Sequence, residues 1–504
     1  MNEIQKCEKT RRPERMLGTT TVLLALLLGL LLLHLIKLRI TSAQLPPGPT
    51  PVPFFGNLWT LKFQLHHKTI MQLAKTYGNI ITIWIGQTPI IVLHGYESIR
   101  EGLIAKSEQL SMRAERPFFK YYANGRGIIV ANGHNWKQQR QLGIQILRNL
   151  GLGSKGMEWK IHLEAQRLVD IFTALKGRAH DPKYCLMNTM SNVIAAVSFG
   201  HHFSLEDQLF HDLVESSDSV TSFFGTRLGQ LYDSFPWLMH HIPGPQQTTF
   251  KHLQFLKCLV MQEIKSHQRN PSTEPQDIID FYLEHISKTK DDPSSPFNEM
   301  NLMQIVLDIF LAGSETLTST FLWGLLFMVL HPDVQAKVQK ELDAHFETYQ
   351  ELHYENRKEV PYTYAVIHEI QRCANVAPVG LPRQCAQDVK IKGYQLKKGT
   401  VIVTCLASAL CDPNYWKFPN DFCPSNFLDE HGNFQSKEAF LPFSTGQRIC
   451  LGRQLAMMEL FIFFTHLLHA FTFQLPQGVT EVNMNGILGT TFRPHPYQIC
   501  AIPR

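Results

Sequence analysis

The chain has 504 residues, of which 44% are hydrophobic and 18% charged. This length and composition suffice for one or two substantial buried cores and exclude a fibrous or disordered protein. The formal net charge of +5 is mild, and no run of Lys and Arg with interleaved aromatic residues occurs, so we expect no nucleic-acid partner. The ten cysteines are scattered and form no CxxC pair, which argues against a zinc ribbon, a thioredoxin-like site and c-type haem.

The first recognisable element is an apolar run from Leu17 to Ile36 that contains no charged residue. At about 1.5 Å per residue, a helix of this length crosses a hydrocarbon core of about 30 Å. We therefore interpret residues 17–38 as a single transmembrane helix, preceded by a short N-terminal tail of residues 1–16. A cleaved signal peptide is the alternative, but its apolar region normally spans only about 7–15 residues.

The flanking charges do not settle the orientation of this anchor. More basic residues precede the anchor than follow it, which by the positive-inside rule would place the N-terminus in the cytosol. However, the chain beyond the anchor has no usable N-x-[ST] acceptor, since a proline disqualifies Asn270-Pro271-Ser272, and this weakly favours a cytosolic body. The residues alone leave both orientations open.

The body of the protein follows a proline-rich linker at residues 39–57, whose prolines predict a stiff, extended connection. The pattern then predicts an amphipathic helix over residues 69–78 and two strands over residues 79–95, joined at Gly86-Gln87. Helical periods dominate after that, with short strands around residues 388–405. We expect residues 58–504 to form one catalytic domain of the mainly α class, an α+β arrangement with minor sheets.

The segment from Asn301 to Leu330 is long and apolar enough to suggest a second membrane span. Its first half contains Asp308 and Glu315, and charged side chains are costly deep within a bilayer. We therefore predict a long helix that is buried inside the protein.

One cysteine has unusual neighbours, because the stretch FSTGQRICLG encloses Cys450 between two glycines, an arginine and a phenylalanine. A thiolate is the metal-ligating form of cysteine, and the N-terminus of the helix predicted after Cys450 lowers the pKa of the thiol. Gly446 permits a tight turn, Gly452 leaves room for a flat cofactor, and Arg448 can pair with an anionic group. A buried structural thiol is the alternative for Cys450 alone, but the whole stretch suits a planar, anionic cofactor whose metal is bound by sulfur.

These residues resemble the haem-binding loop of the cytochrome P-450 family, F-x-x-G-x-R-x-C-x-G, which Phe443, Gly446, Arg448, Cys450 and Gly452 match at every fixed position. The resemblance implies the cytochrome P-450 fold, a large helical domain with a smaller β-rich part. It also implies a haem b whose iron takes its axial thiolate from Cys450. Such ligation favours cleavage of the O–O bond.

A second motif of the family concerns structure around the haem. Glu369 and Arg372 fit its E-x-x-R element and, at i and i+3 on a helix, can form an ion pair. The family normally adds a third residue, Arg or His, at the place where this chain has Asn426. An amide can form hydrogen bonds but carries no charge, so the usual triad is in question here.

Two further motifs imply contacts with the haem propionates. Trp136 and Arg140 fit the W-x-x-x-R element, in which an indole N–H and a guanidinium face the same way. Arg383, in PVGLPRQ, stands where the family often has a propionate-binding Arg or His.

On the opposite side of the haem, Ala312-Gly313-Ser314-Glu315-Thr316 resembles the A-G-x-[DE]-T element of the family. Glycine and a threonine hydroxyl together favour a local opening in the helix where O₂ fits. Thr316 is then expected to organise proton delivery to dioxygen, with Glu315 as its acidic partner. This relay favours a monooxygenase, which inserts one oxygen atom of O₂ into the substrate and releases the other as water.

The electrons must come from outside, since the chain has no G-x-G-x-x-G fingerprint at the start of a helix. The resemblance implies NADPH–cytochrome reductase as the donor, sometimes assisted by cytochrome b5. This requires a cytosolic body on an endoplasmic reticulum membrane anchor, which overrides the charge count. A basic docking face for the partner is predicted at Lys137, Arg140, Arg148 and Arg453.

The linker, WKQQRQLGIQILRNLGLG and LPRQCAQDV resemble vertebrate microsomal members of family two, which oxidise lipophilic molecules such as xenobiotics, fatty acids and steroids. Apolar pocket walls discriminate weakly, by about 1–3 kcal/mol per methylene, so the sequence does not identify the substrate. Arg113, Arg116 and Arg227 are candidates to receive a fatty-acid carboxylate, against the simpler reading of solvated arginines. The predicted pocket wall comprises Phe118, Phe119, Phe223, Phe224, Phe310, Ala312, Val376, Leu381, Ile487 and Leu488.

Two other hypotheses remain open. One is a haem-thiolate isomerase that rearranges hydroperoxides without a reductase; Thr316 and Glu315 count against it, and turnover without NADPH would support it. The other is a membrane-tethered haem-binding or sensing protein without catalysis, which Asn426 alone encourages and which turnover with a reductase would eliminate.

Overall fold

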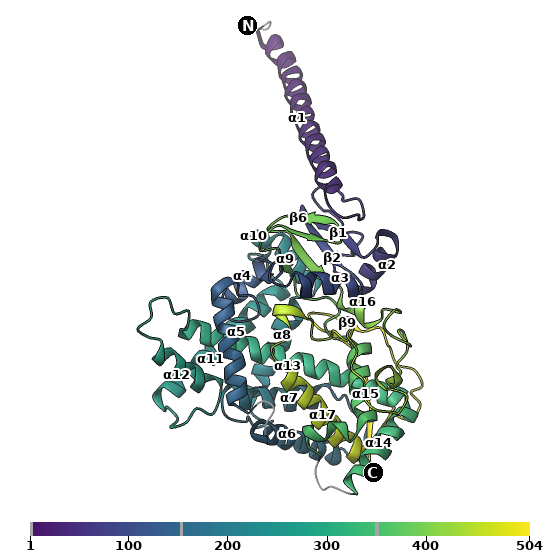
Figure 1. Ribbon diagram of the computed structural model, residues 1–504. Coiled ribbons are helices and arrows are strands. Elements are labelled where there is room, and N and C mark those ends of the chain that lie inside the picture. Colours follow the sequence, from purple (N-terminus) through teal and green to yellow (C-terminus); the bar gives the residue numbers. More distant parts are fainter. Residues whose placement is uncertain (1–3, 152–154, 348–351) are drawn as a thin grey trace.

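The computed structural model describes residues 4–151, 155–347 and 352–504. One long helix projects from a body built mainly of helices, and a β-rich part lies at the end of the body nearest to that helix (Figure 1). The predicted mainly helical α+β architecture is confirmed. The helices are α1 (Ile4–Ala43), α2 (His67–Tyr77), α3 (Tyr96–Arg100), α4 (Pro117–Ala123), α5 (Gly133–Asn149), α6 (Lys155–Ala174), α7 (Lys183–Ser198), α8 (Gln208–Phe223), α9 (Arg227–Ser234), α10 (Pro236–Met239), α11 (Pro245–Arg269), α12 (Ile278–Lys288), α13 (Glu299–Leu330), α14 (Pro332–Phe346), α15 (Pro361–Ala374), α16 (Leu406–Leu410) and α17 (Arg453–Ala470), with short helical turns η1 (Glu101–Ala105), η2 (Tyr354–Lys358), η3 (Pro424–Phe427) and η4 (Gly446–Arg448).

The largest sheet has five strands in the order β1-β2-β7-β4-β3. Strands β1 and β2 form the predicted antiparallel hairpin, with Ile80 opposite Leu93. Strand β7 joins β2 in parallel and so brings a distant part of the chain into the same sheet. The remaining strands form three two-stranded sheets, β5-β6, β8-β11 and β9-β10. The strands are β1 (Ile80–Ile85), β2 (Thr88–Leu93), β3 (Met112–Arg113), β4 (Arg383–Gln384), β5 (Val389–Ile391), β6 (Tyr394–Leu396), β7 (Val401–Thr404), β8 (Phe471–Gln474), β9 (Ile487–Leu488), β10 (Phe492–Arg493) and β11 (Cys500–Pro503).

Helix α13 runs through the middle of the body (Figure 1). Its sequence is apolar on nearly every side, as expected of a helix with neighbours all round. It packs against α7, α8, α11 and α15, and 78% of its most apolar stretch is buried. The prediction of a buried helix rather than a second membrane span is therefore confirmed.

Helix α1 has the opposite environment. It is one of two described helices that are long and apolar enough to cross a membrane, and only 6% of its most apolar stretch is buried. The helix continues to Ala43, beyond the predicted end of the anchor at residue 38. This extension is possible because the first linker proline, Pro46, comes only three residues later.

The sequence predicted a stiff linker that separates α1 from the body. In the structure the linker instead lies against the body. The backbone N–H of Thr82 in β1 donates to the Pro47 carbonyl at 2.9 Å, and the Thr82 hydroxyl donates to the Pro46 carbonyl at 2.6 Å. The Asn57 amide donates to the Pro49 and Thr50 carbonyls. The linker is therefore a docked strap along the outer edge of the five-stranded sheet.

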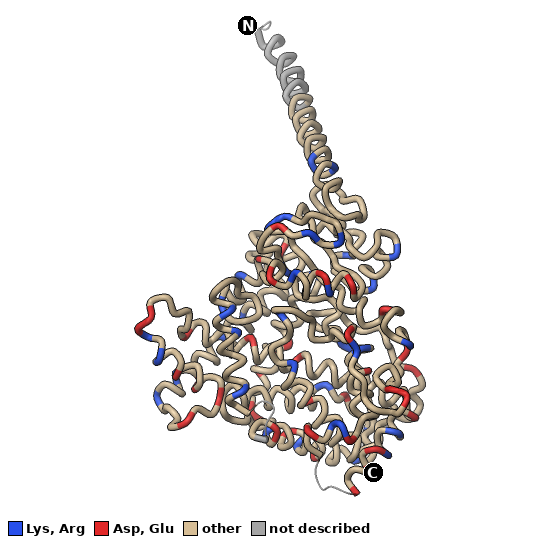
Figure 2. Tube along the Cα trace, viewed as in Figure 1, with Lys and Arg blue, Asp and Glu red and all other residues tan. Residues whose placement is uncertain are grey.

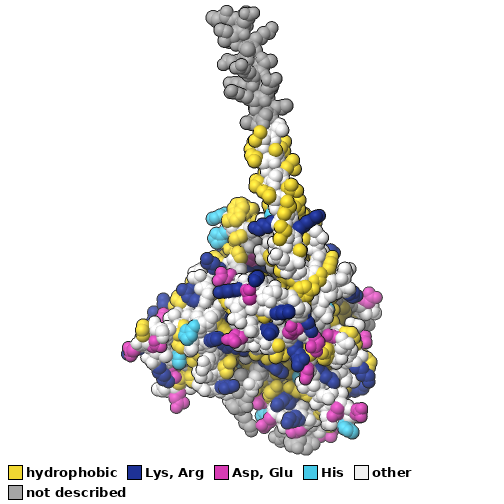
Figure 3. All heavy atoms as spheres, turned by 45° about the horizontal axis from the view of Figure 1, so that its top comes forward, with side chains coloured by type: hydrophobic (Ala, Val, Ile, Leu, Met, Phe, Trp, Pro, Cys, Tyr) yellow, Lys and Arg dark blue, Asp and Glu magenta, His cyan; other side chains and the backbone are white. Residues whose placement is uncertain are grey.

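Charged residues of both signs are spread through the body (Figure 2), whereas apolar side chains cover the described part of α1 (Figure 3). Figure 3 also shows an apolar patch beside the foot of α1. Helix α10, which lies at this end of the body in Figure 1, and its flanks expose Phe235, Trp237, Leu238 and Ile242, with Trp237 72% accessible.

Candidate active site

Cys450 lies on the loop between η4 and α17. The loop is fixed by backbone bonds, from the Ile449 N–H to the Gly446 carbonyl and from the Cys450 N–H to the Phe443 carbonyl, both at 3.0 Å. The side chain of Cys450 is exposed. The loop thus presents the sulfur three residues before the first residue of α17.

Opposing influences act on the pKa of the Cys450 thiol. Desolvation raises the pKa, while hydrogen bonds from the Gly452 and Arg453 N–H groups and the charges of Arg140 and Arg453 lower it. Desolvation is the larger influence, so the pKa lies above the ordinary value for cysteine. The predicted lowering by the helix N-terminus is present in the hydrogen bonds from the Gly452 and Arg453 N–H groups, and burial outweighs it.

The two glycines of the loop have different reasons to be glycine. Gly446 has φ +74°, and a Cβ there would lie 1.9 Å from the Leu103 carbonyl oxygen. A Cβ at Gly452 would meet nothing within 4 Å. Gly446 therefore serves the turn, as predicted, and Gly452 borders open space of the kind that a flat cofactor needs.

We expect Gly446→Ala to destabilise the protein by at least about 3 kcal/mol, because left-handed backbone costs an L-residue about 1–2 kcal/mol and the Leu103 contact adds an overpacking cost. Gly478→Ala is the matched control. Gly478 also has positive φ but no atom near its Cβ position, so about 1 kcal/mol is expected. Thermal unfolding of the two full-length variants, monitored side by side, measures the difference; equal losses would show that the Leu103 contact is unimportant.

Four arginines gather next to this loop. Arg448 is buried and donates to the carbonyls of Ser111, Ile128 and Ala131, with its guanidinium 3.6 Å from the Trp136 ring centre. Arg140 donates to the Ile449 carbonyl at 2.7 Å. Strand pairing sets Arg113 opposite Arg383, which reaches Ser444 and Thr445. Within the described chain, none of the four forms an ion pair with a carboxylate.

The absence of an acidic partner affects the pKa of each guanidinium. Desolvation, followed by repulsion from Arg113, Arg383 and Arg140, lowers the pKa of Arg448 to about 7. Desolvation and the neighbouring arginines likewise lower the pKa of Arg383 to about 9 and that of Arg113 to about 10. Such a concentration of buried positive charge needs an anion to balance it.

Trp136 supports the same conclusion. Its indole Nε1 is buried and has no hydrogen-bond partner among the described residues. A buried donor without an acceptor costs free energy, so a ligand acceptor is expected there. The cationic cluster, this unpaired donor, the accessible Cys450 thiol and the open space at Gly452 together fit a planar dianion with a sulfur-bound metal, as haem is.

The structure adds Arg113 to the arginines predicted for this site. The sequence suggested that Arg113 receives a substrate carboxylate. In the structure Arg113 instead lies opposite Arg383, beside the other arginines of the Cys450 loop. No motif marks it; the signal lies in the pairing of β3 with β4, which sequence patterns did not reveal. Arg116, another of those candidates, is engaged in an ion pair with Asp233.

On α13, the buried stretch from Asn301 to Met328 is interrupted at four positions only, namely Ile309, Ala312, Gly313 and Thr316. Their spacing of i, i+3, i+4 and i+7 places them on one face of the helix. The Thr316 hydroxyl donates to the Ala312 carbonyl at 2.6 Å, as the sequence predicted. A Cβ at Gly313 would lie 2.7 Å from Ile194, so this glycine permits close packing against α7.

Glu315, the expected acidic partner of Thr316 in proton delivery, forms no hydrogen bond with the Thr316 hydroxyl among the described residues. It is buried, and it accepts a hydrogen bond of 2.5 Å from the hydroxyl of Thr491 in the turn between β9 and β10. Desolvation raises the pKa of the carboxyl group. Sequence reasoning could not foresee this orientation, because Thr491 is far away in the chain.

The E-x-x-R pair is closed by the unusual third residue. Arg372 and Glu369 form a bidentate ion pair, with both N–O distances 2.7 Å, and both residues are buried. The Asn426 amide donates to Glu369 at 3.1 Å and exchanges two hydrogen bonds of 3.0 Å with the backbone of Phe418. The triad therefore forms, with an uncharged donor in place of the family's cation.

Several predicted pocket residues do come together. Phe118 of α4 contacts Phe223 and Phe224 at ring-centre distances of 4.8 and 4.7 Å, and Phe119 lies 5.5 Å from Phe224. Val376, Leu381 and Leu488 are partly buried beside the main core, whereas Ile487 is exposed.

Phe310 is a correction to the predicted wall. It is only 1% exposed and packs against Phe199, outside the accessible face of α13. Ile309 occupies that face in its place, three residues before Ala312. The helical spacing from Ala312 could have identified Ile309.

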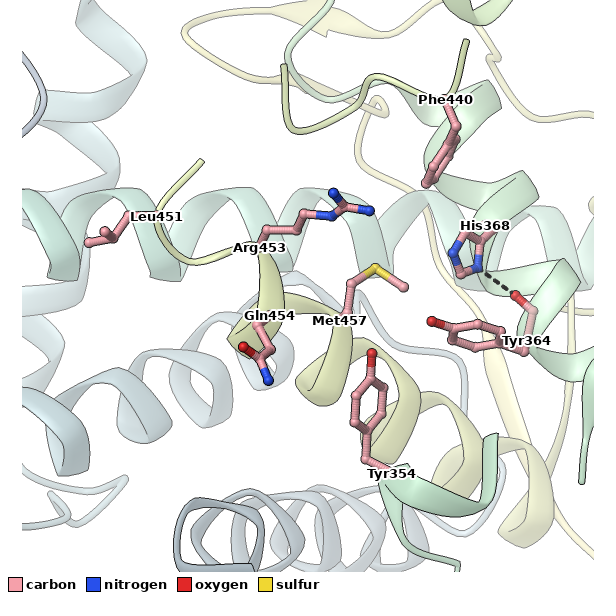
Figure 4. Close-up of a pocket in the computed structure, with 8 residues that line it drawn as sticks. All are labelled: Tyr354, Tyr364, His368, Phe440, Leu451, Arg453, Gln454 and Met457. Carbon is pink, nitrogen blue, oxygen red and sulfur yellow. Dashed lines mark hydrogen bonds between the residues drawn. The ribbon is translucent and has the colours of Figure 1, made fainter. Parts of the chain in front are cut away.

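A cavity of about 280 Å³ borders the chain just after Cys450, at Leu451 and the start of α17 (Figure 4). It is lined by Leu451 and by Arg453 and Met457 of α17, which face Tyr354, Tyr364 and His368. Burial lowers the pKa of His368 to about 4. None of the residues predicted to contact substrate borders this cavity.

The chain belongs to the cytochrome P450 family, since the model of that family, described as "Cytochrome P450", matches residues 46–501. The match begins within the linker, covers the body to residue 501 and includes every haem-related motif discussed above.

The individual relatives lie in family two, as predicted. The chain is 39% identical over 486 residues to "Cytochrome P450 2J2" of Homo sapiens and 40% identical over 486 residues to "Cytochrome P450 2J1" of Oryctolagus cuniculus, with 96% of each chain covered in both cases. It is 39% identical over 463 residues to "Cytochrome P450 2A3" of Rattus norvegicus, covering 92% of this chain and 94% of the relative. The family is one of haem-thiolate monooxygenases, so the class of oxidoreductase and the iron-containing cofactor are those predicted.

Proposed function

We propose that the protein is a membrane-anchored monooxygenase that inserts one oxygen atom of O₂ into lipophilic substrates, with electrons from NADPH delivered by a reductase. The observation that carries the proposal is the accessible Cys450 thiol beside four arginines without a carboxylate partner and an indole N–H without a hydrogen-bond partner, all within the described chain. When bound, haem with a thiolate ligand supplies the chemistry of O–O cleavage.

The residues around the cofactor have separable tasks. Cys450 supplies the sulfur ligand, and Arg113, Arg140, Arg383 and Arg448 offset the charge of the propionates. Trp136 donates its indole N–H to the propionates as well. The side chains of the four arginines are already held by backbone carbonyls, so cofactor binding requires little rearrangement of them.

The proposed substrate class is supported by an aromatic cluster at α4 and the end of α8. Phe118, Phe119, Phe223 and Phe224 pack together into an apolar cluster without charge, which suits xenobiotics, fatty acids or steroids. Apolar contacts discriminate by only about 1–3 kcal/mol per methylene, so we expect several substrates rather than one.

Membrane attachment is proposed for α1, with the body on the cytosolic face of the endoplasmic reticulum. The exposed apolar side chains of α10 lie at the same end of the body as α1, so both can meet one bilayer (Figure 1). Reductase, with or without cytochrome b5, is proposed to dock near the Cys450 loop. Lys137, Arg148 and Arg453 are exposed there, whereas Arg140 turns inward to the Ile449 carbonyl.

Thr316, on the accessible face of α13, is the residue that we propose for proton handling. Thr316→Ala should reduce product formed per NADPH consumed by at least about tenfold, because positioned proton transfer contributes about 10²–10⁴-fold. Thr316→Ser should retain most of the coupling. The measurement is product and NADPH consumption in membranes containing the reductase.

Thr318→Val is the matched control, since Thr318 also donates to the carbonyl four residues earlier but is buried off the accessible face. Equal coupling in Thr316→Ala and the wild type would contradict the proposed role.

One observation favours the alternative of a reductase-independent hydroperoxide isomerase. Glu315 bonds to Thr491 rather than to Thr316, which removes the acid from the expected relay. Incubation with a fatty-acid hydroperoxide in the absence of NADPH distinguishes the two functions. Turnover under these conditions, with none in the presence of NADPH and reductase, would replace the monooxygenase proposal.

A further inference from the structure

A cluster of imidazoles and one carboxylate lies away from the haem loop, where three elements meet. Glu158 and His162 are on α6, His353 immediately precedes η2, and His466 is on α17. They line a cavity of about 580 Å³ together with Trp159. The side chain of Glu158 is 9% exposed, that of His162 23% and that of His353 30%, so the cluster is sheltered but reachable from solvent.

The donor atoms of this cluster are spaced like the ligands of a small metal ion. The distance from His162 Nε2 to Glu158 Oε1 is 3.4 Å, and that from His353 Nδ1 to the same oxygen is 3.3 Å. The same oxygen accepts the Tyr354 N–H at 2.7 Å, and the His353 ring accepts the Asn356 N–H as a cap of η2, so a metal ion bound by His353 would replace this capping bond. Two ligands at about 2.0–2.1 Å from a tetrahedral zinc ion lie about 3.3 Å apart. All three donor atoms fall within 4.8 Å of one another.

The hydrogen bonds of His466 orient the lone pair of His162. His466 Nδ1 lies 2.9 Å from the Ile462 carbonyl oxygen, which can only accept, so the proton is on Nδ1 and the Nε2 of neutral His466 is an acceptor. His162 Nδ1 lies 3.3 Å from that Nε2 and therefore donates to it. Neutral His162 is thus left with its lone pair on Nε2, directed toward Glu158. Metal-binding histidines are typically held by such a second hydrogen bond.

A second group of similar composition, His267 with Asp277 and Asp280, shows what an ordinary ion pair looks like in this protein. His267 Nδ1 donates to the Glu263 carbonyl and Nε2 donates to Asp277, so both ring nitrogens carry protons. Asp277 also caps α12 by accepting from the Asp280 N–H. This imidazolium has no lone pair for a metal, in contrast to His162.

We propose that Glu158, His162 and His353 bind a divalent transition-metal ion, zinc in particular, with the remaining position open to the cavity. Imidazole and carboxylate ligands suit zinc, and three protein ligands with one open position are common for this ion. His466 acts from behind His162 as a positioning residue. The ion joins η2 to α6 and, through His466, to α17. This inference does not depend on the proposed enzymatic function.

The test is zinc binding by the full-length, haem-loaded protein in detergent, purified without a polyhistidine tag and freed of metal by chelation. Titration calorimetry with ZnCl₂ should detect one site per chain with a dissociation constant in the micromolar range or below. His162→Gln and Glu158→Gln should each weaken binding at least 100-fold. His466→Leu should weaken it by about 10–100-fold, as expected for a residue behind a ligand.

His469→Gln is the matched control, since His469 lines the same cavity but is outside the cluster. It should bind zinc like the wild type. A second readout is thermal: zinc should raise the unfolding temperature of the wild type and of His469→Gln in a concentration-dependent way, and leave that of His162→Gln unchanged. Absence of a site tighter than about 100 µM, or equal binding by the wild type and both ligand variants, would overturn the proposal; if one ligand variant does not fold, the other decides.

Discussion

Replacing Cys450 by alanine should eliminate the strongly red-shifted Soret band of the reduced, carbon monoxide-treated protein. The sulfur is the proposed axial ligand of the haem, and no other described cysteine shares its position beside the arginine cluster. Loss of the thiolate should also reduce monooxygenase activity to the background, because thiolate ligation favours O–O cleavage. The measurement is a carbon monoxide difference spectrum of membranes that express each variant, with activity measured in parallel.

The control for this experiment is Cys258→Ser. Cys258 is an exposed cysteine on α11, and its replacement should leave both the spectrum and the activity unchanged. A red-shifted band that survives in Cys450→Ala would assign the ligand to another residue. A wild-type band at the position of histidine-ligated haem would refute thiolate ligation altogether.

Arg372→Ala should have the second large effect, on stability rather than on ligation. Arg372 donates to Glu369 and to the carbonyls of Leu410 and Asp421, and both Arg372 and Glu369 are buried. Without the guanidinium, Glu369 is a buried carboxylate without its counterion, and breaking such a pair costs about 3–5 kcal/mol. We expect most of the full-length protein to accumulate without haem, and the remainder to unfold at a markedly lower temperature.

Two comparisons separate the ion pair from its uncharged third member. Asn426→Ala removes one hydrogen bond to Glu369 and two to Phe418, so about 1–3 kcal/mol is expected. Lys288→Ala, which breaks an exposed pair with Glu284, should cost less than about 0.5 kcal/mol. Thermal unfolding of the haem-loaded variants gives the order; a loss in Arg372→Ala no larger than that in Lys288→Ala would contradict the argument.

The sequence predicted those parts of the molecule that depend on local patterns. The β1–β2 hairpin followed from β-branched residues around Gly86, and the burial of α13 followed from Asp308 and Glu315 within an apolar stretch. The Cys450 loop could be identified because five residues with distinct chemical tasks lie within ten positions.

The parts that were missed depend on partners distant in the chain. Arg113 joins the haem arginines only because β3 pairs with β4, and Glu315 turns toward Thr491 of the β9–β10 turn. Asn426 completes the triad because η3 brings its amide to Glu369, which charge alone had argued against. Phe310 was assigned to the wrong side of α13, although helical spacing from Ala312 would have excluded it.

The strap between α1 and the sheet has a mechanical consequence. A flexible tether would let the body rotate above the bilayer, but the Pro46 and Pro47 carbonyls are bonded to Thr82 of β1. With α1 in a membrane, as proposed, its tilt is transmitted to the sheet, and through the sheet to the loops at the apolar end of the body. The orientation of the body above the lipid headgroups is then restrained by the hydrogen bonds of the strap to β1, rather than averaged by tumbling.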